Sequence, residues 1–192
     1  MRPAAWIGPG LLALAPTAAA AQGLTTTFFD GASCAPLPDA VRASRLQSTL
    51  ELADATAWDL PPGTLVPYTI RMSGMFRADT DGPHTFQLEA DDTVVVTIDG
   101  SEIYSVPGPR GVTTTTFGVA LSAGDHVLAI CHVEEGGPRT FNLRLQAPGS
   151  ASFVPIASRQ LVYDPPFGPG STTIGFDTLA AGTYLTTELV AS

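Results

Sequence analysis

Short runs of alternating apolar and polar residues dominate the chain between residues 23 and 163. The clearest run is RTFNLRLQ, residues 139–146, and TFQLEA, residues 85–90, repeats its pattern. Successive side chains of a strand point to opposite faces, so this period of two predicts strands with one face in a core and the other in solvent. The residues predicted to face the core are Phe141, Leu143 and Leu145 in the first strand and Phe86, Leu88 and Ala90 in the second.

Two further segments complete the prediction of an all-β fold. HVLAICHV, residues 126–133, is apolar at nearly every position, which predicts a central strand covered on both faces. In TVVVTIDGSEIYSV, residues 93–106, two β-rich runs flank Asp99-Gly100, a pair that readily takes the positive φ angles of a two-residue hairpin. No segment keeps a helical period, so the pattern predicts an antiparallel β-sandwich with an Asp-Gly hairpin and long loops.

The remaining segments set the expected domain boundaries. VRASRLQSTLELADA, residues 41–55, is the one stretch with helical character, and an irregular loop is the alternative. A Pro/Gly cluster at residues 165–170 predicts a linker, which ends the sandwich domain, residues 22–164. The tail, residues 171–192, resembles the first strand and turn of a second extracellular β-module, so we expect a truncated module of a longer surface protein there. The alternative is that the tail adds a strand to the sandwich.

The first 21 residues read as a secretory signal peptide. Arg2 precedes an apolar run and an alanine tract that ends at Ala21, so cleavage is expected after Ala21. A membrane anchor is the alternative, but a span needs about 20 consecutive apolar residues, and Pro9, Gly10 and Pro16 interrupt this run. The sequence therefore predicts a secreted or extracellular protein that is not inserted in a membrane.

Charge and cysteine content add two expectations. The formal net charge is −9 and the chain has no lysine, which excludes a basic patch for nucleic acid and suits a cation. Cys34 and Cys131 are the two cysteines, and secretion favours a disulfide between them. Two unpaired thiols are the alternative, because pairing depends on their distance in the fold.

The order of features from Tyr68 onward resembles the protective-antigen-type domain, the PA-fourteen module of bacterial surface proteins and toxins, glycosidases and fungal adhesins. These features are a strand that closes in Ser73-Gly74, the strand beginning His84-Thr85-Phe86, then Asp91-Asp92 and the Ile98-Asp99-Gly100 hairpin. LSAGDHVLAICHVEEGGPRTFNLRLQAPG is similar to the later half of such domains, and GLTTTFFDG to their first strand. The family often has an aromatic residue where this chain has Met72, and another where it has His132.

This resemblance implies a β-sandwich whose sugar-binding members hold calcium through paired aspartates. Here those residues would be Asp91 and Asp92, joined by a cis peptide, and the calcium would bind sugar hydroxyls. An asparagine ligand of the fungal adhesins corresponds by position to Glu134. Adjacent carboxylates at a strand end also suit calcium in their own right, since Ca²⁺ takes 6 to 8 oxygen ligands. The alternatives are a solvated turn at the aspartates and a solvated loop residue at Glu134.

Other candidates for chemistry are weaker. Asp79-Thr80-Asp81-Gly82 lacks the later ligands of a calcium loop and predicts a tight turn. His126 and His132 fall in phase on one strand, but without a third ligand they favour core or edge positions over a zinc site. Trp58 is expected to be a core anchor. No catalytic motif is visible, so the sequence predicts a non-catalytic domain that binds glycan through calcium, with a structural or protein-interaction module as the alternative.

Overall fold

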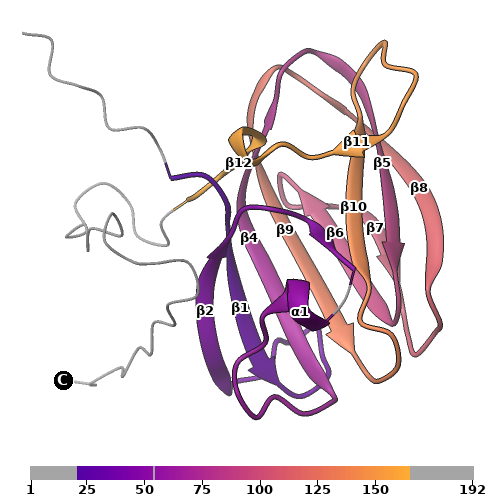
Figure 1. Cartoon of the computed structure of the whole chain (residues 1–192). Coiled ribbons are helices and arrows are strands. Elements are labelled where there is room, and N and C mark those ends of the chain that lie inside the picture. The colour runs from indigo at the N-terminus through magenta and orange to yellow at the C-terminus, as the bar shows by residue number, and fades with distance from the viewer. Residues whose placement is uncertain (1–20, 54, 165–192) are drawn as a thin grey trace, which may run out of the picture.

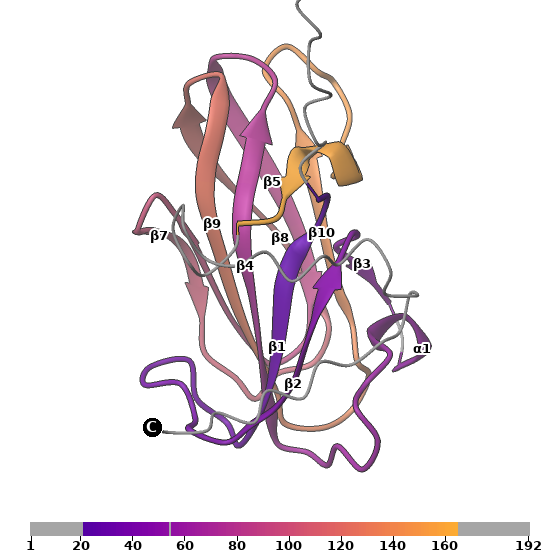
Figure 2. The ribbon, with the colours of Figure 1, turned by 90° about the vertical axis from the view of Figure 1, so that its left-hand side faces the viewer.

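The computed structural model describes residues 21–53 and 55–164, which fold as a sandwich of two antiparallel sheets. The predicted all-β class is confirmed. Figure 1 shows the two sheets side by side, and Figure 2 shows the larger one in front, with the smaller behind it. Nearly all of the predicted signal peptide, and the whole of the predicted linker and tail, lie outside the described residues.

The larger sheet has seven strands and the smaller one has five. In the larger sheet the order is β2-β1-β4-β9-β6-β7, and β12 also pairs with β4. In the smaller sheet the order is β11-β10-β5-β8, and β3 also pairs with β10. The strands of the larger sheet are β1 (Leu24–Asp30), β2 (Val41–Gln47), β4 (Tyr68–Ala78), β6 (Thr93–Ile98), β7 (Ser101–Val106), β9 (Gly124–Glu134) and β12 (Leu161–Val162). Those of the smaller sheet are β3 (Glu51–Leu52), β5 (Gly82–Ala90), β8 (Thr113–Leu121), β10 (Phe141–Gln146) and β11 (Val154–Pro155).

The alternating strands fill the space between the sheets, as the sequence predicts. Phe86, Leu88 and Ala90 of β5 are buried, and so are the three predicted core residues of β10. Aromatic rings carry the contact between the sheets, because Phe76 of β4 meets Phe86 edge to face at 5.6 Å between ring centroids. This packing fixes which faces of β5 and β9 point inward, and so positions the side chains at their ends.

Strand β9 is central, as predicted, but it is not covered on both faces. It lies between β4 and β6, and its first half alternates strictly, with Leu128 buried and Val127 49% exposed. The reason is that no described segment forms a layer over Val127 on the outer face of the larger sheet. On the same outer face, Cys131 is joined to Cys34 by a disulfide, which confirms the predicted pairing.

The predicted hairpin is confirmed, whereas residues 41–47 form neither the helix nor the irregular loop that the sequence suggested. Asp99 and Gly100 take φ angles of 50° and 76°, which are the two positive angles that a tight hairpin between β6 and β7 requires. Residues 41–47, in contrast, form β2, which pairs along β1 because that strand would otherwise leave its backbone groups unpaired. The helical part of residues 41–55 is confined to its end, where α1 (Ala55–Trp58) begins. No helix in the described ranges is long and apolar enough to cross a membrane.

Candidate metal centre

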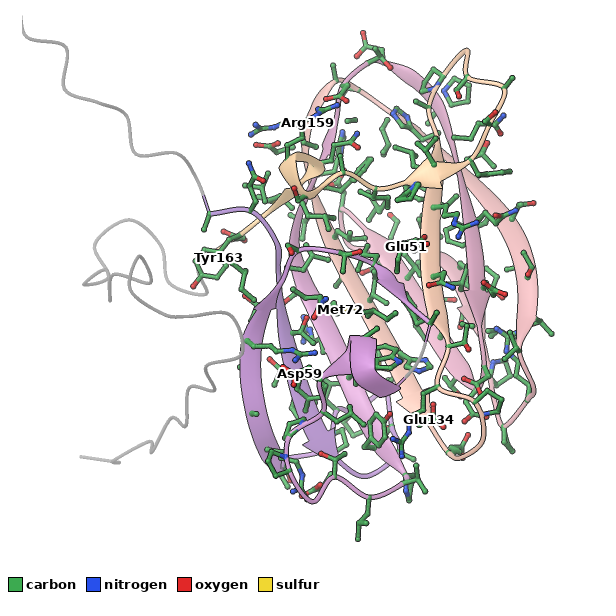
Figure 3. The ribbon with its side chains drawn as sticks, in the orientation of Figure 1. Glu51, Asp59, Met72, Glu134, Arg159 and Tyr163 are labelled. Carbon is green, nitrogen blue, oxygen red and sulfur yellow. A yellow bond between two sulfur atoms is a disulfide. The ribbon has the colours of Figure 1, made fainter. Side chains whose placement is uncertain are left out.

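Three connections and the end of β9 meet at one end of the sandwich, which we call the loop end. The connections are Asp91-Asp92 between β5 and β6, residues 107–112 between β7 and β8, and residues 135–140 between β9 and β10. The register places them together, since Ala90 pairs with Phe141 and Val94 pairs with Val106. Figure 3 labels Glu134 here, at the last position of β9.

Asp92 holds the loops of this end with its carboxylate. One oxygen, Oδ1, accepts the N–H of Arg110 at 3.0 Å, and Oδ2 accepts the N–H of Glu135 at 2.6 Å. Its own N–H donates to the Arg110 carbonyl oxygen at 3.2 Å. These bonds join the two loops on either side, and Asp92 is only 2% exposed. Asp92 is therefore a positioning residue as well as a potential oxygen ligand.

The peptide bond between the two aspartates is trans, so the cis bond implied by the resemblance is not present here. Asp92 instead has a φ of 55°, in the left-handed region that aspartate tolerates better than most residues. In an extended strand two neighbours would point to opposite faces. Here the left-handed residue turns the chain between β5 and β6, and the two carboxylates contact different backbone groups, Asp92 those of Arg110 and Glu135 and Asp91 that of Thr140.

Asp91 and Glu134 each keep one buried oxygen without a hydrogen-bond partner among the described residues. Asp91 Oδ1 accepts the N–H of Thr140 at 3.4 Å, while its Oδ2 has no partner. Glu134 Oε1 accepts the N–H of Gly136 at 3.0 Å, while its Oε2 has no partner. Both residues are 0% exposed. Burial raises the pKa of Asp91, and burial together with the charges of Asp91 and Asp92 raises the pKa of Glu134 to about 7.

His132 contributes a third buried atom without a partner. Its Nδ1 lies 3.2 Å from the carbonyl oxygen of Thr93, and because a carbonyl only accepts, Nδ1 carries the hydrogen. Nε2 therefore carries a lone pair, and it has no partner. Burial lowers the pKa of His132 to about 4, so the ring is neutral at pH 7. The indole of Trp58 stacks on it at 5.4 Å between centroids and holds its orientation.

The three residues that carry these atoms belong to one cluster. Asp91, His132 and Glu134 offer ligand atoms that all lie within 4.8 Å of one another. His132 and Glu134 are two residues apart on β9, so both face inward, and Asp91 approaches from the end of β5. Each of the three clustered residues thus has a buried acceptor atom that no described group donates to, an arrangement that a cation or a bound proton would stabilise. The structure thus brings together the predicted residues Asp91 and Glu134 and adds His132, whereas the Asp92 oxygens are engaged with backbone.

The cluster is covered by the loop that follows β9. A side-chain Cβ at Gly137 would lie 3.7 Å from Asp91 Oδ2, so this glycine lies next to the Asp91 side of the cluster. Tyr68 stands opposite Glu134 in the pairing of β4 with β9, and its buried hydroxyl has no partner. Burial, and next the charge of Glu134, raise the pKa of Tyr68 above its usual range. The guanidinium of Arg139 lies 6.0 Å from the Tyr68 ring and adds one positive charge at this end.

Apart from His132, the weaker sequence candidates have protein partners. Asp79 forms an ion pair with Arg159 at 2.9 Å, and Asp81 accepts the N–H of Ala123 at 2.6 Å, as expected for a turn. Trp58 is a core anchor, 0% exposed, with its Nε1 donating to the carbonyl oxygen of Arg139 at 3.1 Å. Of the two histidines, only His132 lies in the cluster. The sequence signal that could have found it is the spacing of His132 and Glu134, which puts both on one face of a strand.

Solved structures share this fold at low sequence identity. An anti-sigma factor domain-containing protein matches with a TM-score of 0.66 and 18% identity over 82% of this chain and 52% of its own. The PA14 domain of the MpAFP antifreeze protein matches with a TM-score of 0.64 and 18% identity over 79% of this chain and 95% of its own. A PA14 sugar-binding domain from an RTX adhesin matches with a TM-score of 0.61 and 15% identity over 76% of this chain and 100% of its own.

Sequence comparison gives two further findings. Glutamate–tRNA ligase 1 of Hyphomonas neptunium is 35% identical over 88 residues, which are 46% of this chain and 17% of the ligase. The chain thus spans less than a fifth of that curated relative, and the stretch carries no argument about the ligase's activity. The family described as "PA14 domain" matches residues 20–153, which is more than half of the chain. With its two antiparallel sheets and the Asp91-Asp92 connection at their end, the chain belongs to the PA14 domain family.

Proposed function

We propose that this chain is a secreted, non-catalytic carbohydrate-binding domain whose glycan site lies at the loop end. The observation that carries the proposal is the pair of buried, unpartnered carboxylate oxygens of Asp91 and Glu134 at that end. It is supported by the match to the whole of a PA14 sugar-binding domain from an RTX adhesin. The disulfide between Cys34 and Cys131 supports an extracellular location, because such bonds persist in oxidising compartments.

We further propose that a divalent cation at Asp91 and Glu134 assists glycan binding. Calcium is the ion that the family resemblance implies, and carboxylate oxygens are its preferred ligands. When bound, calcium would supply coordination positions that neighbouring sugar hydroxyls can fill. Asp91 and Glu134 would hold the ion, and Asp92 would keep the two flanking loops in place through its bonds to Arg110 and Glu135. Since both ligand residues are 0% exposed, a sugar that contacts the ion must displace the segment around Gly137.

One observation favours a second candidate function, a structural or protein-interaction module of a larger protein. The trans peptide between Asp91 and Asp92, and the engagement of both Asp92 oxygens by backbone N–H groups, leave fewer free oxygens than a calcium site of paired aspartates needs. In that case the fold would be kept and the cation-assisted glycan site would be absent. The two functions differ in one measurable property, which is glycan binding that depends on a cation.

A glycan array tests the proposal directly. The metal-stripped protein is applied with calcium, with zinc and with chelator, and the Asp91→Asn and Glu134→Gln variants are applied beside it. Glu135→Gln is the matched control, because Glu135 is the exposed neighbour of buried Glu134. We expect cation-dependent binding by the parent and by Glu135→Gln, and its loss in the other two variants. Absence of glycan binding under all conditions would favour the structural module.

A further inference from the structure

We infer that Asp91, His132 and Glu134 form a buried site for a transition-metal ion of the zinc class, with His132 Nε2 as its nitrogen ligand. The inference concerns the same cation site as the proposed function. It rests on that function only for the role of the bound ion in glycan binding. It assigns to the site a ligand set and a metal preference that differ from the paired-aspartate calcium site.

The first step is the hydrogen-bond arrangement of His132. A metal-ligating histidine almost always donates its other ring N–H to a carboxylate, a backbone carbonyl or water, which fixes the tautomer and aims the lone pair. His132 has this arrangement, with Nδ1 at 3.2 Å from the carbonyl oxygen of Thr93. Its Nε2 is buried without a partner. If His132 only filled space in the core, the desolvation of Nε2 would reduce the stability of the fold with nothing to offset it.

The second step is the chemistry of the donor set. Calcium takes oxygen ligands, whereas imidazole nitrogen suits Zn, Cu, Fe and Ni, and zinc binds imidazole nitrogen and carboxylate oxygen together. Asp91 Oδ2, His132 Nε2 and Glu134 Oε2 are three buried atoms with no hydrogen-bond partner in the part of the chain that the structure describes, and one ligand atom from each residue lies within 4.8 Å of those of the other two. Zinc bonds of about 2.0–2.2 Å require the ligands to approach slightly, which side-chain rotation of two carboxylates provides.

The third step is burial and rigidity. All three residues are 0% exposed, so an ion bound among them would be shielded from bulk solvent, and three protein ligands leave the fourth tetrahedral position of zinc open. The ring of His132 is held between Trp58, with ring planes 9° apart, and Phe141 at 5.7 Å. Asp91 belongs to the β5–β6 connection and Glu134 is the last residue of β9, so an ion here would join that connection to the end of β9. The metal would thereby order the loops that the proposed glycan site uses.

Calorimetry on the tag-free full chain, stripped with chelator, tests the inference with ZnCl₂ and CaCl₂ as probes. We expect one zinc ion to bind at least about 100-fold more tightly than calcium. At a zinc concentration about 100 times its Kd, the melting temperature should rise by about 8 °C. A preference for calcium, or no binding of either ion, would overturn the inference, the second result indicating a cluster held by a shared proton.

The His132→Phe variant tests the nitrogen ligand. Phenylalanine keeps a ring against Trp58 and Phe141 but removes the lone pair, so zinc affinity should fall by more than about 100-fold. His126→Phe is the matched control on the same strand and should bind zinc as the parent does. Equal zinc affinity of His132→Phe and the parent would overturn the inference. Should His132→Phe not fold, Glu134→Gln, which keeps the shape of the side chain, replaces it with the same expectation.

A spectroscopic readout locates the ion without relying on affinity. In a Trp6→Phe background Trp58 is the only tryptophan, and its ring lies 5.4 Å from that of His132. Co²⁺ bound at the cluster should quench its fluorescence in stoichiometric amounts and give a visible absorption band, and both signals should be absent in His132→Phe. Signals that persist in His132→Phe would place the ion elsewhere and overturn the inference.

The outcomes for metal and glycan can be told apart. Zinc binding that needs His132, with no glycan bound under any condition, would support the inference and count against the proposed function. Glycan binding supported by calcium and unchanged in His132→Phe would support the proposed function and overturn the inference.

Discussion

The two ends of strand β9 carry the same residue types in opposite states. At its start, His126 has both ring nitrogens next to acceptors, with Nδ1 at 2.7 Å from Asp99 Oδ2 and Nε2 at 2.8 Å from the carbonyl oxygen of Ser122. At its end, His132 has one nitrogen beside a carbonyl and one without a partner, next to two buried carboxylates. The first set is satisfied by the protein alone, and the second is not.

This difference separates an ordinary structural ion pair from a candidate site. Asp99 is 52% exposed, and its bond to His126 raises the pKa of the histidine and lowers that of the aspartate. Around His132 burial has the opposite effects, lowering the pKa of the histidine and raising those of Asp91 and Glu134. Groups that are held buried against their preferred charge state cost folding free energy, and such costs concentrate at functional sites.

The largest expected effect comes from removing the indole ring of Trp58, which stacks on His132. Trp58→Ala leaves a cavity where a fully buried ring stacks on His132, so we expect a loss of about 3–5 kcal/mol in the free energy of unfolding. Urea denaturation followed by far-UV circular dichroism measures it. Trp58→Phe, which keeps an aromatic ring, should lose clearly less. A loss below about 1 kcal/mol for Trp58→Ala would mean that Trp58 does not support this end of the sandwich.

The next effect concerns the loops on either side of the cluster. Asp92→Ala removes the acceptors of the Arg110 and Glu135 N–H groups, and we expect it to destabilise the domain by about 1–3 kcal/mol. Hydrogen exchange should become faster at those two amides specifically. Asp125→Ala, which breaks an exposed pair with Arg77, is the control and should change stability by less than about 1 kcal/mol. Unchanged exchange at Arg110 and Glu135 would contradict the positioning role.

The third variant should stabilise the protein, in contrast to the first two. In metal-free protein Glu134→Gln removes a buried carboxylate next to Asp91 and supplies an amide donor to a cluster of acceptors. We therefore expect a gain of about 1 kcal/mol in stability at pH 8, together with the loss of cation binding. Thermal denaturation in chelator measures the gain, and Glu135→Gln should stay within about 0.5 kcal/mol of the parent. Destabilisation by Glu134→Gln would show that the carboxylate is satisfied without a metal.

The smallest expected effect on stability comes from the pair of His126 and Asp99 at the start of β9. The pKa of His126 is raised above 6.5 in the folded protein, so its contribution is fully present below pH 6.5 and is lost as pH rises through the raised value. The pKa of Asp99 is lowered below 3.8, so its contribution is present above that pH and is lost on acidification. The pair of His126 and Asp99 therefore stabilises the folded protein most between about pH 3.8 and pH 6.5.

His126→Gln tests that window. Because Asp99 is half exposed, we expect the parent to exceed the variant by only about 0.2–1 kcal/mol at pH 5.5, with a smaller difference at pH 8.5. Denaturant titrations of both proteins at the two pH values, in chelator, give the comparison. A difference that grows toward pH 8.5 would contradict the assigned direction of the His126 pKa.

The sequence by itself determined the parts of this protein that depend on local pattern. The period of two in β5 and β10 predicted their buried faces, and the Asp99-Gly100 pair predicted its hairpin, since both depend only on neighbouring residues. The family resemblance brought Asp91 and Glu134 into one hypothesis. Local pattern failed at residues 41–47, because β2 is a strand by virtue of its pairing with β1, which periodicity does not record.

Only the tertiary structure decided how the site is composed. His126 and His132 look equivalent in sequence, and their difference arises from which strands and loops pack against each ring. Asp91 and Asp92 are adjacent, yet one keeps an unpartnered oxygen and the other holds two loops, because Asp92 takes a left-handed φ of 55°. Whether a polar atom has a partner depends on residues far away in the sequence, as when the N–H of Glu135 donates to Asp92 Oδ2. Such long-range contacts are fixed by the packing of the two sheets and not by the local sequence.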